Sequence, residues 1–336
     1  MKIGHSPAIA VLIAFVFCCS LNGQDKKADL PESIGEIVWH KKKQFAKLVP
    51  EGSKIEVLAG GFEWSEGPVF LPDNNEVLFS DIPNNMIVSW KEGKGTSTFL
   101  KPAGYTGAEK FTGSEPGSNG LMLDANGTLY MCCHGDRCIK KMVDGKAIVV
   151  VDKYDGKRFN SPNDLVFHKN GDLYFTDPPY GLPKRMDDPG RELDWCGVYR
   201  YSKGKVTLLT KEMTRPNGIA FSPDFKTLYV AQSDPKAAIW KSFPVKEDGT
   251  LGESKVFFDA TDWVGKEKGL PDGMAVDKKG RVWATGPGGV LVFNKRGKLI
   301  GQLNTKEATA NCTFGNDGYL YITADMYFCR VKTTMK

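Results

Sequence analysis

The fold is indicated by one unit of sequence, Pro162-Asn163-Asp164 followed by Leu165-Val166-Phe167-His168-Lys169-Asn170-Gly171-Asp172-Leu173-Tyr174-Phe175. A polar cluster leads into an apolar run, a tight Asn-Gly turn and an aromatic run, which is the pattern of two antiparallel strands joined by a hairpin. Similar units begin at five further clusters: Ser65-Glu66-Gly67-Pro68, Ser118-Asn119-Gly120, Pro216-Asn217-Gly218, Pro271-Asp272-Gly273 and Ala310-Asn311-Cys312. Six such units indicate a ring of repeats rather than a β-sandwich.

The spacing of the clusters predicts the architecture. Neighbouring clusters are 39 to 55 residues apart, which is the size of a four-stranded propeller blade with loops of varying length. In the fourth unit the strands are expected at residues 218–221, 227–231, 238–241 and 255–258. We therefore predict an all-β, six-bladed β-propeller over residues 51–336. Its last blade is one strand short, and residues 54–59 are expected to complete it and close the ring.

The first 50 residues have a different composition. Residues 1–23 read as a signal peptide, with a positive start, a 12-residue apolar core at Ala8–Cys19 and small or polar residues after it. Twelve apolar residues are too few to span a bilayer, so no stable membrane insertion and an exported, periplasmic or secreted protein are expected. An uncleaved anchor and lipidation at Cys18 or Cys19 stay open as alternatives. The Lys-rich residues 24–50 are expected to form a tail or a short helix.

Charge and cysteine content exclude other classes of protein. The formal charge is only +5, and its Lys and Arg residues are scattered without a basic stripe, so nucleic acid is not an expected partner. Six cysteines follow the signal peptide, and an exported chain permits disulfides whose pairing the sequence leaves open. These are Cys132, Cys133, Cys138, Cys196, Cys312 and Cys329. Their spacing does not match a zinc finger or zinc ribbon.

The polar clusters predict a metal site. In a propeller the first strand of each blade lines the central channel, so clusters far apart in sequence meet at one mouth. Glu66, Asn163, Asn217 and Asp272 would supply two carboxylates and two amide oxygens there, which are ligands that Ca²⁺ prefers. Zn²⁺, Mn²⁺ and Mg²⁺ stay open, although the absence of His and Cys argues against zinc. The alternative is that these residues only form turns.

Five stretches resemble the SMP-30/gluconolactonase family, and most closely its bacterial gluconolactonases. They are residues 65–68, 160–166, 175–181, 215–224 and 271–274, of which the run from 160 to 181 is the most specific. The resemblance covers about residues 54–334 and implies a six-bladed propeller that hydrolyses sugar lactones with one divalent metal at the channel mouth. It also implies Glu66, Asn163, Asn217 and Asp272 as ligands, with His134 facing the channel.

The expected reaction is opening of a sugar lactone by a water that the metal activates. A bound cation would act as a Lewis acid on the carbonyl, and a general base is still needed. Asp272 is the first candidate for that base and His134 the second. Four polar residues are candidates for contacts to the substrate: Asn119, Arg158, Asn160 and Tyr180. No Gly-x-Ser-x-Gly or Gly-x-Gly-x-x-Gly motif supports a serine nucleophile or a dinucleotide.

A second function stays open from the sequence. A non-catalytic propeller, stabilised by calcium, would use the same mouth to bind a sugar or a protein. The small-molecule partner expected for the enzyme is a lactone or a sugar acid. Nothing in the sequence indicates an oligomeric state.

Overall fold

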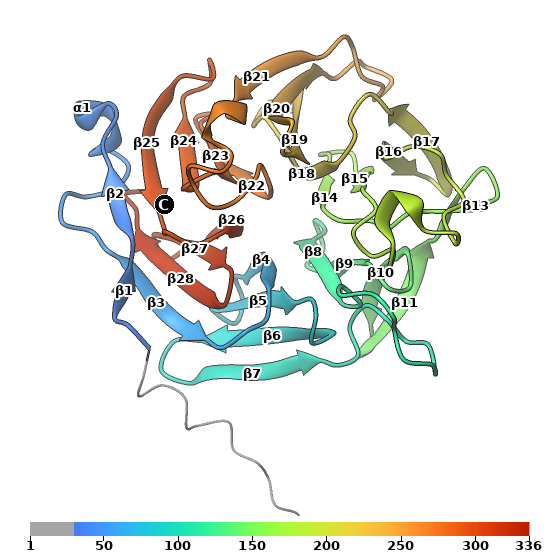
Figure 1. Cartoon of the computed structure of the whole chain (residues 1–336). Coiled ribbons are helices and arrows are strands. Elements are labelled where there is room, and N and C mark those ends of the chain that lie inside the picture. The colour runs from blue at the N-terminus through green and yellow to red at the C-terminus, as the bar shows by residue number, and fades with distance from the viewer. Residues whose placement is uncertain (1–29, 336) are drawn as a thin grey trace, which may run out of the picture.

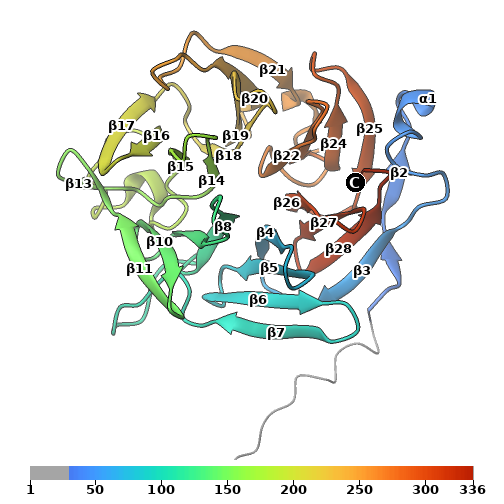
Figure 2. The same ribbon diagram turned by 180° about the vertical axis from the view of Figure 1, so that it is seen from behind.

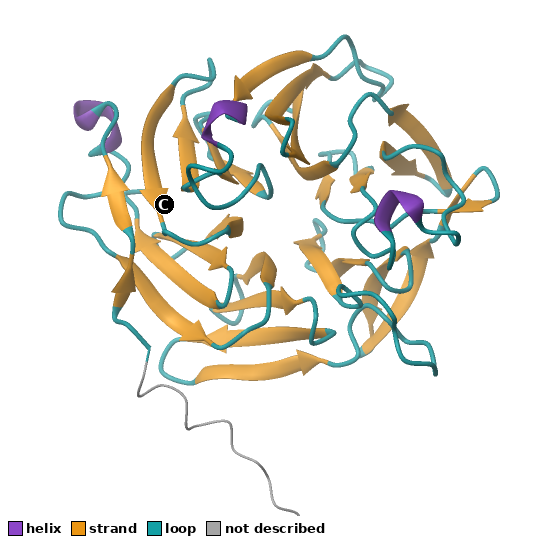
Figure 3. Cartoon of the chain, viewed as in Figure 1, coloured by secondary structure: helices purple, strands orange, loops and turns teal. Residues whose placement is uncertain are grey.

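The computed structural model describes residues 30–335 and shows six antiparallel sheets arranged in a ring about a common axis (Figure 1). The view from behind shows the same ring, with the first strand of each blade nearest the axis (Figure 2). Strands dominate, and the described helices are short (Figure 3). The predicted six-bladed β-propeller is therefore confirmed.

In blades 1 to 5 the four blade strands follow chain order from the axis outwards, and in blade 6 the N-terminal strand β3 takes the fourth place. Blade 1 holds β4 (Ser65–Leu71), β5 (Glu76–Asp81), β6 (Met86–Lys91) and β7 (Gly95–Leu100). Blade 2 holds β8 (Ser118–Leu123), β9 (Leu129–Cys133), β10 (Cys138–Val143) and β11 (Lys146–Val151). Blade 3 holds β14 (Leu165–Phe167), β15 (Leu173–Asp177), β16 (Gly197–Ser202) and β17 (Lys205–Thr210).

The other three blades repeat this arrangement. Blade 4 holds β18 (Pro216–Phe221), β19 (Thr227–Asp234), β20 (Ala237–Pro244) and β21 (Lys255–Asp259). Blade 5 holds β22 (Met274–Val276), β23 (Val282–Gly286), β24 (Gly289–Phe293) and β25 (Leu299–Asn304). Blade 6 holds β26 (Thr309–Phe314), β27 (Tyr319–Ala324), β28 (Tyr327–Lys332) and β3 (Ile55–Gly60).

The ring closes through β3, as the sequence predicted. This strand pairs antiparallel with β28, in a register that places Ile55 opposite Val331 and Gly60 opposite Tyr327. Arg330 Nε donates to Glu56 Oε2 at 2.8 Å across the same pair. Strand pairing between the two ends of the chain leaves the last blade without an open hydrogen-bonding edge at β28.

The segment before β3 adds strands that the sequence did not predict. Strand β1 (Ser33–Ile34) pairs with β3, and β2 (Glu36–Val38) pairs with β25, so blades 5 and 6 each have a fifth strand. Helix α1 (Lys42–Phe45) follows, and it buries Phe45. A short helix was thus expected in this segment, but the two strands were not. They escape prediction because they pair by backbone groups on outer edges and carry no alternating apolar pattern.

Short elements occupy the loop before blade 3, the loop between β15 and β16 within blade 3, and the loop before blade 5. They are the hairpin strands β12 (Lys153–Tyr154) and β13 (Lys157–Arg158) and the 3₁₀ helices η2 (Arg185–Asp187) and η3 (Thr261–Trp263). No described helix has the length and apolar content needed to cross a membrane. The predicted signal peptide, residues 1–23, lies outside the described residues.

Apolar side chains fill the spaces between neighbouring blades. At the closure, Phe79 of blade 1 stacks on Phe328 of blade 6 with 4.4 Å between ring centroids. All six cysteines between residues 30 and 335 are buried free thiols. Burial of apolar surface between blades therefore stabilises the ring here, without described disulfides.

Glycine after an anchor residue lets neighbouring inner strands approach closely. A Cβ atom on Gly67 would lie 2.1 Å from the backbone oxygen of Asn119, and one on Gly218 would lie 2.1 Å from that of Asp272. Gly67 also has a φ of +50°, which other residues rarely adopt. These glycines bring the polar clusters of successive blades into contact at the axis.

Candidate active site

The polar clusters meet at a cavity of about 470 Å³ at one end of the propeller axis. Five of its polar lining residues come from the clusters of blades 1 to 5, one from each blade: Glu66, Asn119, Asn163, Asn217 and Asp272. Four further residues complete the polar lining, namely Glu115, Tyr180, Ser233 and Glu267. Trp64, Pro235, Val264 and Leu270 supply apolar walls. The cavity therefore combines oxygen ligands with surfaces on which an organic ligand can pack.

Two carboxyl groups contact each other in this cavity. Glu66, on β4, is 1% exposed and accepts a hydrogen bond from its neighbour Gly67 N at 2.6 Å. Its carboxyl is also hydrogen-bonded to that of Asp272, which precedes β22. Burial raises the pKa of Glu66 to about 8. Burial and the proximity of Glu66 raise the pKa of Asp272 well above its ordinary value, so the two acids hold protons readily.

Oxygen atoms without partners are concentrated in the same residues. Asn119 Oδ1, Asn163 Oδ1 and Asp272 Oδ1 are buried and accept no hydrogen bond from the described residues. Asn217 Nδ2 donates to Ser233 Oγ at 2.9 Å, which leaves the amide oxygen of Asn217 for the cavity that this residue lines. Buried acceptors without donors cost free energy, so this arrangement is suited to a ligand that accepts electron pairs.

The donor set fits a hard divalent cation. It offers two carboxylates and up to three amide oxygens, which match the oxygen ligands of Ca²⁺. Among residues 30–335, no group of three or more His, Cys, Asp or Glu side chains is placed to hold a metal. A zinc site built from three such side chains is thus not found in the described part of the chain. A site with mixed carboxylate and amide ligands is compatible with this finding.

His134 lies behind the cavity wall rather than on it. Its side chain is fully buried, directly after β9, and its Nε2 atom lies 3.5 Å from Asn119 Nδ2 and 3.4 Å from Asn163 Nδ2. Its Nδ1 atom lies 3.3 Å from Glu115 Oε2, and Arg185 Nη2 contacts Glu115 Oε1 at 2.8 Å. Burial alone would raise the pKa of Glu115, but contacts with His134 and Arg185 outweigh it and hold that pKa below its ordinary value.

The structure brings seven of the nine predicted site residues together. Six of the seven line the cavity, and Tyr180 does so from the loop before η2. The seventh, His134, contacts Asn163, which lines the cavity. Arg185 donates to the backbone oxygen of Tyr180 at 2.9 Å, and its guanidinium lies 5.1 Å from the centre of the Tyr180 ring. Burial raises the pKa of Tyr180 above its ordinary value, so its hydroxyl stays protonated.

Arg158 and Asn160 lie away from this cavity. Arg158 Nη2 donates to the backbone oxygen of Asp136 at 3.0 Å. Asn160 is fully buried, and its Nδ2 donates to the backbone oxygen of Trp195 at 2.8 Å. Both side chains therefore bind loops of the propeller, and the structure does not bring them to the residues around Glu66 and Asp272.

Sequence reasoning missed Glu115, Arg185, Ser233 and Glu267. Ser233 could have been found from the sequence, because the second strand of several blades carries a serine or threonine at the equivalent position. These hydroxyls donate to backbone oxygens of the next cluster: Ser80 to Asn119 and Thr176 to Asn217, at 2.8 and 2.7 Å, and Ser233 to Pro271. Glu115 lies on an irregular loop and Arg185 begins the short helix η2, and no repeat of the sequence marks either position.

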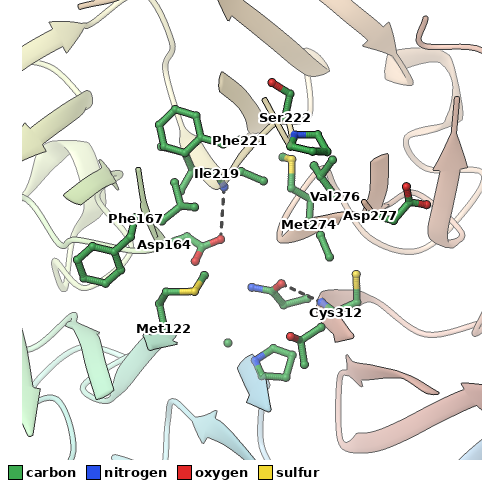
Figure 4. A pocket seen from close by; sticks show the side chains of 18 of the residues that line it. Met122, Asp164, Phe167, Ile219, Phe221, Ser222, Met274, Val276, Asp277 and Cys312 are labelled. Atoms are coloured by element: carbon green, nitrogen blue, oxygen red, sulfur yellow. Dashed lines mark hydrogen bonds between the residues drawn. The ribbon is translucent and has the colours of Figure 1, made fainter. Parts of the chain in front are cut away.

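A second cavity, of about 370 Å³, lies further along the inner strands towards the other end of the axis (Figure 4). Met122, Phe167, Phe221, Met274 and Val276 give it mainly apolar walls. Its buried acid, Asp164, accepts from Leu165 N at 2.9 Å and from Ile219 N at 3.4 Å, and burial raises its pKa to about 7. This cavity lacks unpaired amide oxygens of the kind that mark the first one.

Together, the ring of six blades and the cluster of carboxylate and amide oxygens at one end of its axis define a propeller with a candidate cation and ligand site. A model of the SMP-30/Gluconolactonase/LRE-like region matches residues 64–325. The chain belongs to this family.

Individual relatives cover most of the chain. It is 41% identical to a gluconolactonase of Zymomonas mobilis over 302 residues, which are 85% of this chain and 83% of that protein. It is 24% identical to a pentonolactonase of Haloferax volcanii, over 77% of this chain and 80% of that protein. The solved structure of a gluconolactonase from Xanthomonas campestris superposes with a TM-score of 0.77 at 30% identity, covering 90% of this chain and 97% of that one.

Proposed function

We propose that this protein is a lactonase that opens a sugar lactone, with a divalent cation, Ca²⁺ in the first instance, held by Glu66, Asn163, Asn217 and Asp272. Similarity to gluconolactonases over most of the chain supports the lactone-hydrolysing function. The observation that supports the cation is the set of buried, unpaired oxygens on Asn119, Asn163 and Asp272 beside the Glu66 carboxyl.

When bound, the cation would polarise the lactone carbonyl as a Lewis acid. The protein would supply the remaining chemistry. Water adds to the carbonyl carbon, the ring C–O bond breaks, and the ring oxygen takes a proton as the hydroxy acid forms. Asp272 would accept the proton of the attacking water, because its Oδ1 is unpaired beside the cavity.

Several residues would position the substrate. Tyr180 keeps its hydroxyl proton and lines the cavity, so it would donate a hydrogen bond to a sugar hydroxyl or to the ring oxygen. Trp64 offers an aromatic face on which the carbon side of a sugar ring can pack. Asn119, whose oxygen is also unpaired, would bind either the substrate or the cation.

The alternative is a propeller that binds a sugar or a protein at this cavity without catalysis. The cavity favours the enzyme, because a purely structural cation would not require unpaired oxygens next to a space large enough for a small sugar.

We further propose that the protein is exported, because residues 1–23 have the sequence features of a signal peptide. Comparison of the N-terminus of the mature protein with the encoded one tests that proposal.

Hydrolysis of glucono-δ-lactone by the purified protein tests the function. Acid release is followed with the uncatalysed rate subtracted, first in a chelator and then after Ca²⁺, Mg²⁺, Mn²⁺ or Zn²⁺ is added. We expect hydrolysis that the chelator abolishes and that Ca²⁺ restores. Hydrolysis that the chelator does not change would contradict the cation, and no hydrolysis over a panel of sugar lactones would favour the non-catalytic alternative.

A further inference from the structure

We propose that His134 is a positioning residue that turns the amide oxygens of Asn119 and Asn163 towards the cavity, and that Glu115 selects the tautomer of His134 that this requires. The inference rests on the proposed function, because those oxygens serve a cation or a substrate there. It replaces a role for His134 as general base, since the imidazole is fully buried and is not among the residues that line the cavity.

The contacts of His134 determine which nitrogen carries the proton. Glu115 Oε2 lies 3.3 Å from Nδ1, an ion-pair contact in which Nδ1 does not reach standard hydrogen-bond geometry. Because an ionised carboxylate can only accept, this contact favours the tautomer with the hydrogen on Nδ1. In that tautomer Nε2 is the acceptor nitrogen. The amide nitrogens of Asn119 and Asn163 lie 3.5 and 3.4 Å from it, and both can donate to it.

This hydrogen bonding sets the direction of both amides. With its nitrogen turned to His134, each side chain leaves its oxygen unpaired, and both residues line the cavity. The opposite tautomer would present an N–H group at Nε2. The amides would then turn their oxygens to His134, and the cavity would lose two acceptors.

The third amide at the cavity, that of Asn217, is also oriented by a hydrogen-bond acceptor. Ser233 Oγ donates its hydrogen to the backbone oxygen of Pro271, so it can only accept from Asn217 Nδ2. Asn217 therefore also turns its nitrogen to the protein and its oxygen to the cavity. A hydrogen-bond acceptor therefore orients each of the three amides: Ser233 in blade 4 orients Asn217, and His134 orients both Asn119 and Asn163.

Arg185 makes the role of Glu115 specific. Its Nη2 atom contacts Glu115 Oε1 at 2.8 Å, which leaves Oε2 for His134. In a Glu115→Gln variant Arg185 would keep the amide oxygen, because Arg can only donate. The Gln amide nitrogen would then face Nδ1 and donate to it, which forces the proton of His134 to Nε2. The substitution thus reverses the tautomer with almost no change in shape.

Glu267→Gln is the matched control. Glu267 also lines the cavity and carries one negative charge, but its described side-chain hydrogen bond comes from Asn304 Nδ2 at 3.4 Å and it does not contact His134. Both variants therefore remove one charge from the same cavity, and only one of them alters the tautomer.

Two measurements test the proposal. In the calcium-free protein, nitrogen NMR of labelled histidine reports the tautomer, and the chain has only four His residues to assign. We expect Nδ1–H on His134 in the wild type and Nε2–H in Glu115→Gln. By calorimetry, we expect Glu115→Gln to weaken Ca²⁺ binding by about 10–100-fold, as for other residues that orient metal ligands, and Glu267→Gln to weaken it much less.

The outcomes separate this inference from the proposed function. Nε2–H in the wild type, or equal losses of affinity in the two variants, would overturn the positioning role even if the protein is a calcium-dependent lactonase. A wild type that binds no divalent cation would overturn the proposed cation. The histidine spectra would then still support or refute the control of the tautomer by Glu115.

Discussion

The carboxyl groups of Glu66 and Asp272 are hydrogen-bonded to each other, although they come from the first and fifth blades of the ring. Two ionised carboxylates within hydrogen-bonding reach of each other would repel, and burial makes the repulsion stronger. Without a cation, a shared proton relieves the repulsion. Glu66 and Asp272 would hold a divalent cation in place of that proton, so their contact connects the closure of the ring to the proposed chemistry.

Asp272→Asn is expected to abolish cation binding and hydrolysis together. The substitution keeps the shape of the side chain but removes one of two ligand charges, so Ca²⁺ affinity should fall more than about 100-fold, beyond the loss typical of supporting residues. In chelator, the variant should be at least as stable as the wild type, because it no longer buries an acid against Glu66. Calorimetry, lactone turnover and thermal melting give the three values. Wild-type turnover by Asp272→Asn would refute the role of Asp272 as ligand and base.

Ca²⁺ is expected to stabilise the folded protein. A ligand that binds only the native state raises the free energy of unfolding by about 2.7 kcal/mol at a free concentration of 100 times its Kd. The melting temperature should therefore rise as Ca²⁺ is added to the wild type. Asp272→Asn is the control, in which the same additions should leave the melting temperature unchanged. An equal rise in both proteins would place the stabilising ion elsewhere.

The six-fold repeat could be predicted from the sequence because a similar local sequence pattern occurs in each blade. A polar cluster and a two-strand pattern recur at all six inner strands, and five of the six clusters contain a glycine or proline. Ring closure then brings Glu66, Asn163, Asn217 and Asp272 to one end of the axis. The closing strand β3 could also be predicted, since the last blade lacked an outer strand. These features depend on periodic patterns, which a single sequence contains.

The rest of the site depends on side-chain direction in loops. Asn160 lies only three residues before Asn163, but Asp177 accepts hydrogen bonds from the backbone of residues 160 and 161, and the Asn160 side chain turns to Trp195. Glu115 and Arg185 come from two different loops and meet only in the folded ring. No local pattern encodes such contacts, so sequence reasoning included Asn160 and omitted Glu115.

Phe328→Ala is expected to weaken the closure of the ring. Phe328 is fully buried and stacks on Phe79 of blade 1, so the substitution leaves a cavity where the first and last blades meet. Removing a buried Phe side chain typically costs about 3–5 kcal/mol. Phe99→Ala is the matched control, because Phe99 is 41% exposed on the outer strand of blade 1 and should change stability by less than about 0.5 kcal/mol. Denaturant unfolding measures both, and equal losses would argue against a special role of the closure.

Asp177 is expected to make stability depend on pH. Burial raises the pKa of this carboxyl to about 7, although hydrogen bonds from the backbone N–H groups of Asn160 and Ser161, and the nearby charge of Arg137, oppose the shift. In the unfolded chain the same group ionises near pH 3.9. Between these two values the native state holds a proton that the unfolded state has lost, so the free energy of unfolding falls as pH rises.

Asp177→Asn removes this titration and isolates its effect. The stability of the wild type minus that of the variant should be largest near pH 4, decrease up to about pH 7 and then level off. Urea unfolding of both proteins in chelator, at several pH values across this range, measures the difference and keeps cation binding out of it. A difference that does not change with pH would mean that the two N–H groups hold Asp177 ionised in the native state. In that case the loop that carries Asn163 would be fixed by a buried carboxylate rather than by a carboxylic acid.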